Sequence, residues 1–270
     1  MIHFRLNDID SIQPVGQEPN LYLSWFWLTD GDVWLSFGDQ TIYEYSQEAM
    51  QHFGNKLSPY NDYYIVRFVE DFTEIFDAIC VSIPEALYRR TENIRQFRND
   101  VEKWLERYST EEDYYDNVYF PATPSLLSWL DDRHLDSGYL VGGPHLSFFR
   151  HHNTIRIVWE TDQTLDNGIR LWTAISGSVE MNYTDFIDRV KAFGQNFFAA
   201  MNTRVHSAVA NDWGTVTVDT IRLVEEHAER ELEFTTRVSL LEGNPQDTTD
   251  WSEIEKLYAQ MNSDIRPHSP

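Results

Sequence analysis

Basic residues, cysteine and long apolar runs are all scarce in this chain, and each scarcity excludes a class of protein. The 21 lysines and arginines face 44 acidic residues, so the formal net charge is −23 at pH 7. A surface this negative repels the phosphates of nucleic acids and of anionic membranes. We therefore expect no direct contact with nucleic acid and none with a membrane.

The single cysteine, Cys80, has no second cysteine with which to form an internal disulfide. The first ten residues lack the basic start and apolar run of a signal peptide. No stretch approaches the roughly 18 consecutive apolar residues that a membrane helix needs. Together these observations predict a cytoplasmic protein, since free cysteines are typical of reducing compartments.

Catalytic signatures are missing as well. The glycines of residues 137–145 are not followed by the Gly-Lys-Ser/Thr of a phosphate-binding loop, and no Gly-x-Ser-x-Gly elbow occurs. His145, His151 and His152 follow the acidic segment 131–136, but no His-Glu-x-x-His motif or paired Cys/His spacing accompanies them. We therefore predict no catalytic residue, no metal site and no cofactor.

Aromatic side chains, in contrast, are abundant and make up 14% of the chain. Residues 21–46 hold three of the nine tryptophans, Trp25, Trp27 and Trp34, around Asp30-Gly31. In residues 21–28, the odd-numbered positions and the even-numbered positions are both apolar, apart from Ser24. This pattern is typical of a strand that is covered on both faces. Asp-Gly favours a tight hairpin turn. We therefore predict strands over 21–28 and 33–37 with most of the three tryptophans buried, and a third strand over 41–45 after a turn at Gly38-Asp39.

The remaining chain alternates between helical and strand-like patterns. The predicted helices are 61–80, 84–108, 124–135, a long helix after residue 184, 219–241 and 250–262. The predicted strands are 143–150, 154–160, 168–174 and 177–181. This order indicates an α+β fold of antiparallel sheet meanders packed against several helices, with a C-terminal helical extension. We place a core domain at 1–210 and an acidic helical extension, packed on the core, at 211–270.

The ratio of acidic to basic residues is highest between residues 108 and 136, where seven acids accompany a single base, Arg133. Tyrosines lie among them, and tyrosine is common at interfaces because it offers a rigid apolar face and a hydroxyl. A solvated acidic loop would have the same composition. The predicted partner-binding residues are Glu111, Glu112, Asp113, Tyr114, Tyr115, Asp116, Asp131 and Asp132.

Several segments resemble a bacterial family of unknown function. They are "SWFWLTDG" (24–31), "LDSGYLVGGPHLSFFR" (135–150) and "LWTAISGSVEMNYTDFIDRVKAFGQNFFAAM" (171–201). The resemblance covers about residues 2–210 and implies no catalytic position. In character, small acidic bacterial proteins of this kind are similar to immunity proteins, which neutralise the toxins of competing bacteria.

These observations favour an immunity-type protein that binds and neutralises a cognate, basic toxin, because opposite charges speed association. Two alternatives stay open. The first is an enzyme acting on a small molecule or carbohydrate through a pocket of tryptophans and carboxylates. The second is a nucleic-acid mimic that uses helical acids in place of phosphates, with Glu225, Glu226, Glu229 and Glu233 as the candidates.

Overall fold

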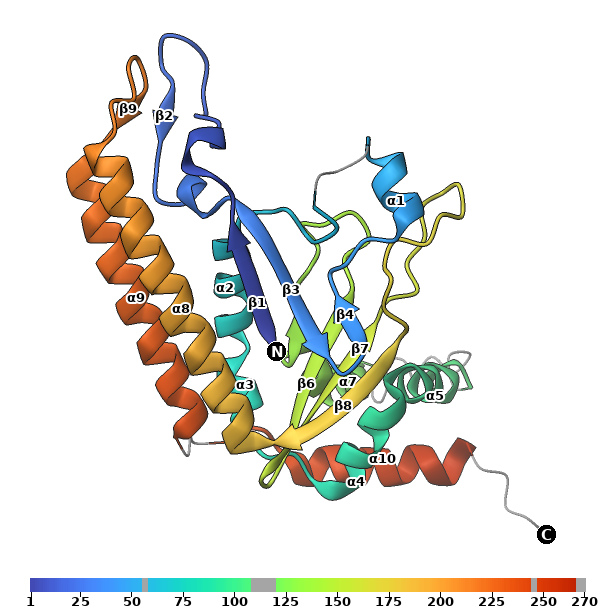
Figure 1. Ribbon diagram of the computed structural model, residues 1–270. Helices are drawn as coiled ribbons and strands as arrows, with labels where there is room; N and C mark the ends of the chain where they lie inside the picture. The colour runs from blue at the N-terminus through green and yellow to red at the C-terminus, as the bar shows by residue number, and fades with distance from the viewer. Residues whose placement is uncertain (55–57, 108–119, 244–246, 266–270) are drawn as a thin grey trace.

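The structure is a computed structural model that describes residues 1–54, 58–107, 120–243 and 247–265, with residues 120 and 121 described by their backbone only (Figure 1). The strands are β1 (Ile2–Leu6), β2 (Tyr22–Leu23), β3 (Gly31–Phe37), β4 (Gln40–Ile42), β5 (His134–Leu135), β6 (His145–His151), β7 (Thr154–Glu160), β8 (Gly177–Asn182) and β9 (Thr217–Val218). The α-helices are α1 (Gln47–His52), α2 (Ile65–Glu74), α3 (Phe76–Ile79), α4 (Glu85–Tyr88), α5 (Ile94–Glu106), α7 (Phe120–Asp131), α8 (Tyr183–Ala210), α9 (Thr220–Glu242) and α10 (Trp251–Ile265).

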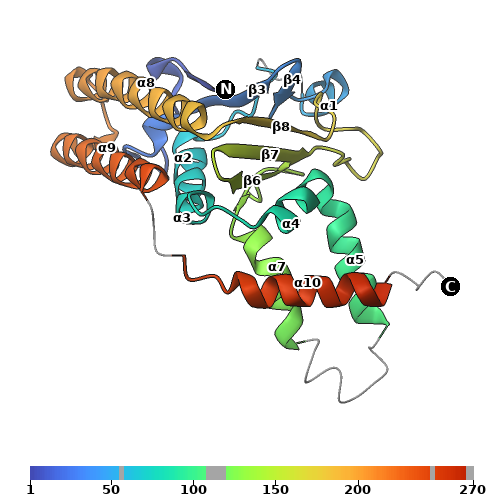
Figure 2. The ribbon, with the colours of Figure 1, turned by 90° about the horizontal axis from the view of Figure 1, so that it is seen from below.

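Three sheets form in the described chain, and helices pack around them (Figures 1 and 2). One antiparallel sheet has the order β1-β3-β4, and a second has the order β5-β6-β7-β8. The short strands β2 and β9 pair in parallel. Antiparallel sheets packed against helices make this an α+β fold, as the sequence predicts.

The helix α2 lies at the centre of the larger core. Phe68 packs edge-on against Phe193 of α8, with 5.9 Å between ring centroids. One turn later, Phe72 contacts Phe148 of β6 at 5.4 Å and Phe186 of α8 at 6.4 Å. Both α2 phenylalanines are fully buried. This helix therefore joins the second sheet and α8 into one apolar cluster, which also includes β3.

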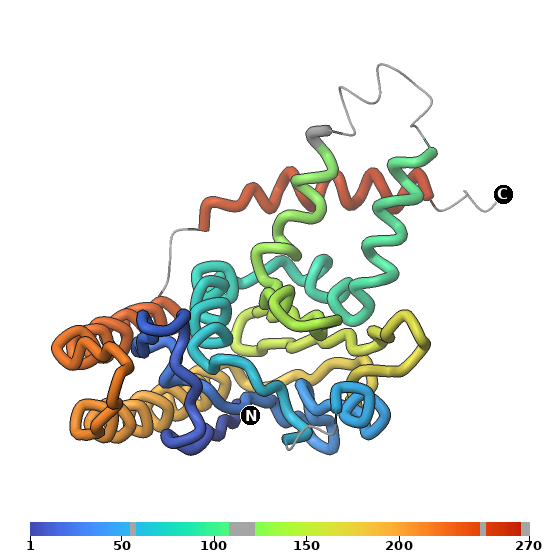
Figure 3. Tube along the Cα trace, turned by 90° about the horizontal axis from the view of Figure 1, so that it is seen from above, coloured from blue at the N-terminus to red at the C-terminus, as the bar shows by residue number. Residues whose placement is uncertain are grey.

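A second core lies on the other side of β6 and β7, where α5, α7 and α10 pack together (Figures 2 and 3). Successive residues of a strand face opposite sides of its sheet. Phe148 of β6 accordingly belongs to the first core, and its neighbour Phe149 belongs to the second, where it packs against Trp129 of α7. Covering on both faces explains why this strand is apolar at successive positions.

The hairpin predicted at Asp30-Gly31 is wrong. Trp27–Thr29 form a short 3-10 helix, and β3 pairs with β1 instead of with the residues before the turn. A Cβ atom at Gly31 would lie 2.3 Å from the backbone oxygen of Arg5. The glycine is therefore required for close approach of two strands and not for a turn. The next turn, at Gly38-Asp39, does join β3 to β4, with Gly38 at φ +60°.

The three tryptophans of this region differ in burial. Trp25 is fully buried and packs against Phe197 and Phe198 of α8. Trp27 and Trp34 are only half-buried. The prediction that these tryptophans belong to the core is therefore confirmed for Trp25 and holds in part for the other two.

Further predicted elements need correction. The helix expected over 124–135 ends at Asp131, and His134–Leu135 form β5 instead. The helix expected over 84–108 is divided into α4, a 3-10 segment at Arg89–Asn93 and α5, because the Asn93 side chain accepts a hydrogen bond from the Gln96 backbone N–H and begins a new helix. The strand expected over 168–174, all of it described, does not form. Its residues make two isolated bridges, Trp172 with Tyr45 and Arg170 with Thr164.

The helices α8 and α9 form an antiparallel pair along one edge of the molecule (Figure 1). The side chains that α9 adds to the larger core are Leu223, Phe234, Val238 and Leu241. A Cβ atom at Gly194 would lie 1.9 Å from the ring of Phe234, so this glycine lets the two helices approach. Although both helices are long, no described helix is apolar enough over a sufficient length to cross a lipid bilayer.

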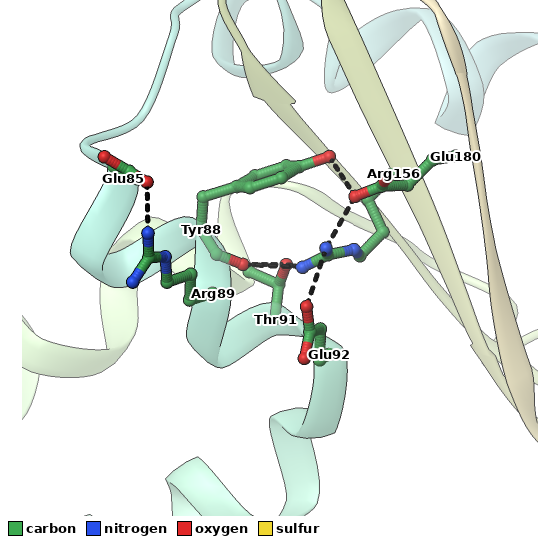
Figure 4. Close-up of polar contacts among 7 residues, drawn as sticks. All are labelled: Glu85, Tyr88, Arg89, Thr91, Glu92, Arg156 and Glu180. Carbon is green, nitrogen blue, oxygen red and sulfur yellow. Dashed lines mark hydrogen bonds and ion pairs between the residues drawn. The ribbon is translucent and has the colours of Figure 1, made fainter.

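Arg156 of β7 connects the second sheet to the α4–α5 segment (Figure 4). Its guanidinium lies 4.3 Å from the centre of the Tyr88 ring, and Nη1 donates to the Tyr88 backbone oxygen and to Thr91 Oγ1 at 2.7 and 2.9 Å. Its Nη2 contacts Glu180 at 2.5 Å and Glu92 at 3.2 Å. Because burying a cation is costly unless it is paired and hydrogen-bonded, this network keeps Arg156 and its partners in one arrangement.

We expect Arg156→Met to lower the free energy of unfolding by about 2–4 kcal/mol, because methionine keeps the apolar stem and loses the bonds to Tyr88, Thr91 and Glu180. Arg89→Met is the control variant in the same segment. The side chain of Arg89 is 72% exposed against 7% for Arg156, so loss of its pair with Glu85 should cost less than about 1 kcal/mol. Urea unfolding measures both variants. Equal losses would mean that the buried network contributes no more than a surface ion pair.

Candidate functional site

Most of the predicted partner-binding residues fall outside the described residues. These are Glu111, Glu112, Asp113, Tyr114, Tyr115 and Asp116. The other two, Asp131 and Asp132, are described and exposed: Asp131 ends α7 and Asp132 follows it. The structure therefore places the predicted site at the turn between α7 and β5, through these two aspartates.

An open cleft of about 630 Å³ lies beside Asp131 and Asp132. Its walls come from three distant parts of the chain: the end of α2 with α3, the turn from α7 into β5, and the residues that precede α10. Each of the three parts contributes acids. The carboxylates that line the cleft are Glu74, Asp77, Asp131, Asp132 and Asp247.

The acidic cleft stays negative after its ion pairs are counted. Five carboxylates and one guanidinium, that of Arg133, give a formal charge of 1 − 5 = −4. Asp77 pairs with Arg237 at 3.1 Å and Asp131 pairs with Arg98 at 2.9 Å. These two arginines bring the local sum to −4 + 2 = −2. Because a cleft concentrates the field of its charges, cations are attracted to this opening.

The lining acids differ in the hydrogen bonds and ion pairs that they form within the protein. The side chain of Asp247 accepts hydrogen bonds from two neighbours in the sequence, the Thr249 backbone N–H and the Trp251 indole. Glu74 and Asp132 have no ion-pair partner in the part of the chain that the structure describes. These two carboxylates are the ones best placed to receive a cation from outside.

Arg133 lies beneath the cleft and is almost completely buried. Its Nη1 donates to the Trp129 backbone oxygen at 2.8 Å, and its guanidinium carbon lies 5.5 Å from the centre of the Trp251 ring. Burial lowers the pKa of Arg133 to about 10, and the charges of Asp132 and Asp247 oppose that decrease. The acids of the cleft therefore have a structural role as well, since they stabilise a buried cation.

A smaller hollow of about 380 Å³ adjoins the acidic cleft and shares Asp131 and His134 with it. His145 also lines this hollow, with 5.2 Å between the two imidazole centroids. Burial, together with the charge of His145, lowers the pKa of His134. Across the described ranges, no three His, Cys, Asp or Glu side chains are placed to hold a metal ion. His151, which the sequence groups with these histidines, stacks on Tyr88 instead.

Three lining carboxylates were not predicted: Glu74, Asp77 and Asp247. Glu74 and Asp77 are three residues apart on the polar side of the stretch 61–80, so helical spacing alone indicates that they face the same way. Nothing in the sequence indicates that they face Asp132, which follows a different helix, or that Asp247 joins them.

The model of a family described as "Family of unknown function (DUF5984)" matches residues 1–257. The chain belongs to the DUF5984 family. The match extends beyond residue 210, so the residues of α9 and of part of α10, which lie outside the resemblance seen in the sequence, also fall within it. No curated protein and no solved structure matches the chain.

The interior of this DUF5984 protein contains a second polar cluster, around Asp71 of α2. Arg67 Nη2 lies 2.8 Å from one Asp71 oxygen, and the other oxygen has no hydrogen-bond partner among the described residues. The buried side chain of Asn61 lies beside Tyr139. Burial, with the charges of Tyr43 and Asp71, raises the pKa of Tyr139, so these groups lie near one another.

Burial raises the pKa of Asp71 from 3.8 to about 6, with Arg67 opposing the increase and nearby acids adding to it. The folded DUF5984 chain thus binds this proton more tightly than the unfolded chain does. The contribution of Asp71 to the free energy of unfolding should therefore fall by up to about 3 kcal/mol as pH rises from about 4 to 6, and stay level above.

We expect Asp71→Asn to remove this contribution, so that the difference in stability between variant and wild type changes by up to about 3 kcal/mol between pH 4 and pH 7. Urea unfolding at several pH values measures it. Asp166→Asn changes an exposed acid that is not among the groups acting on Asp71 and serves as the control. The same pH profile for wild type and Asp71→Asn would contradict the raised pKa.

Proposed function

We propose that this protein is an immunity-type protein that binds and neutralises a cognate, basic toxin in the bacterial cytoplasm, and that the acidic cleft receives a lysine or arginine of that toxin. The observation that carries the proposal is an open cleft that keeps a net negative charge and is lined by two exposed carboxylates, Glu74 and Asp132, that form no ion pair among the described residues. The net charge of −23 supports it.

Electrostatics gives this arrangement two advantages. The overall charge speeds the encounter with a basic protein at long range, and this effect weakens with added salt. Inside a cleft, fewer water molecules screen a pair of opposite charges, so an ion pair there contributes more than one on an open surface. The acidic cleft is therefore suited to selecting a basic partner and orienting it.

Its walls also support tight binding. The helices α2, α3 and α7 that carry the lining side chains are anchored in the two cores. Binding to groups that are already held in place loses less conformational freedom than binding to a mobile loop.

If the product of the neighbouring gene is the cognate toxin, we expect the double variant Glu74→Gln/Asp132→Asn to weaken binding to it by at least about tenfold. Asp166→Asn/Asp188→Asn is the matched control, because it removes two exposed acids elsewhere and also changes the net charge from −23 to −21. The control should weaken binding less than about threefold, since distant charges are screened. Calorimetry at low salt and relief of toxicity on co-expression are the measurements.

Equal effects of the two double variants would mean that only total charge matters and that the acidic cleft is not the contact. If the neighbouring gene's product neither binds nor is relieved of toxicity by the wild-type chain, the immunity proposal itself fails.

An enzyme remains the second candidate because of one observation, the raised pKa of Asp71 beside a buried tyrosine. General acids and bases act best when their pKa lies near the working pH. The same co-expression assay separates the two functions. A binding protein should still protect with Asp71→Asn, provided that the variant is folded by circular dichroism. A folded variant that no longer protects would favour the enzyme.

A nucleic-acid mimic has less support, because the acids of α9 are partly neutralised. Glu226 pairs with Arg230 at 2.9 Å, and Glu229 pairs with Arg222 at 3.0 Å. These pairs interrupt the row of free carboxylates that would imitate successive phosphates.

A further inference from the structure

The outer face of α9 carries apolar side chains that the described part of the chain does not cover. Ile221, Val224 and Leu232 are 71%, 51% and 68% exposed, and Ala228 between them is exposed too. Steps of three and four residues place all four on one side of a helix. With a rise of about 1.5 Å per residue, they form a ridge about 16 Å long, which we call the α9 stripe.

Single exposed apolar residues are common on protein surfaces. The unusual feature of the α9 stripe is that several of them lie together on one side of a helix. Only eight large hydrophobic side chains are exposed in the described ranges, and three of them lie in the α9 stripe. A helix at the edge of a molecule normally turns a polar face outward. The helix α9 buries one apolar side against α8 and presents a second one outward.

A hollow between α8 and α9 continues the α9 stripe. Thr235 and Ser239 follow Leu232 at the same helical spacing, and both line this hollow of about 330 Å³. Apolar atoms of Phe198 and Phe234 lie in its lining. The surface therefore has an apolar ridge at one end and, at the other, a depression lined by apolar side chains and by the Lys191–Glu242 ion pair. A partner helix can pack against a surface of this shape.

Charges beside the α9 stripe indicate what can bind there. Glu225 follows Val224 and Glu231 precedes Leu232, so both acids lie beside the α9 stripe. Neither has an ion-pair partner within the described residues. A second copy of this chain would bring the same acids against them, and like charges repel. Lysine or arginine side chains beside an apolar strip would instead pair with them.

We propose that the α9 stripe and the adjoining hollow bind an amphipathic helix of a partner protein whose apolar face is flanked by lysines and arginines. This proposal does not depend on the acidic cleft, whose walls are α3, the α7–β5 turn and the segment before α10.

The probe is a synthetic 18-residue helical peptide of leucines at stripe-like spacing with lysines at the remaining positions, labelled for fluorescence anisotropy. A second peptide replaces every lysine with glutamate. We expect the full-length protein to bind the lysine peptide at micromolar concentration and not the glutamate peptide. Val224→Ser/Leu232→Ser should weaken this binding by at least about tenfold.

The chain offers a matched control in Val141→Ser/Ile175→Ser, which removes two aliphatic side chains that are 65% and 63% exposed elsewhere. This variant should bind the lysine peptide within about twofold of wild type. Equal weakening by both double variants, or none by either, would overturn the proposal and leave only general attraction to an acidic surface. Sedimentation without peptide tests self-association. A dimer that Val224→Ser/Leu232→Ser abolishes would overturn it in favour of a second copy.

Discussion

The packing of α2 is the constraint on which most of the other features depend. Phe68 and Phe72 place one side of this helix against α8 and β6. With that side fixed, the helix must hold Asp71 inside the protein and Glu74 at the edge of the acidic cleft. Apolar packing thus decides where two carboxylates lie, and their surroundings give them different properties: one has a raised pKa and the other is open to solvent cations.

The two cores give the acidic cleft its location. Phe148 and Phe149 of β6 face opposite sides of one sheet, so each core is built on a different face of the same strands. The cleft lies where elements of the first core, α2 and α3, meet elements of the second, α7 and the residues before α10. Such a junction can be lined by charged groups because neither core needs apolar atoms there. Arg133 is the exception, since it is buried under this junction and depends on the acids above it.

The sequence predicts the features that depend on residues close together in the chain. It does not predict those that depend on contacts between distant residues. Helices such as α9, and the α+β class, follow from local periodicity, and the Gly38-Asp39 turn follows from local backbone geometry. The role of Gly31 could not be predicted, because its need for a small residue comes from Arg5, a residue on a different strand. The same reason limits the site. Asp132 was found through its local charge, whereas Glu74 and Asp247 join it only through tertiary packing.

Trp25 has a consequence for how this chain is made. Its indole lies beside His227, with a nitrogen–nitrogen distance of 3.4 Å, and the guanidinium of Arg230 covers its ring at 4.8 Å. Both partners are more than two hundred residues further along the chain, and the parallel pairing of Tyr22 with Thr217 joins segments that are almost as far apart in the sequence. During synthesis on the ribosome, the large ring near the N-terminus is therefore completed long before the helix that covers it. Native closure of that region has to wait for almost the entire polypeptide to emerge.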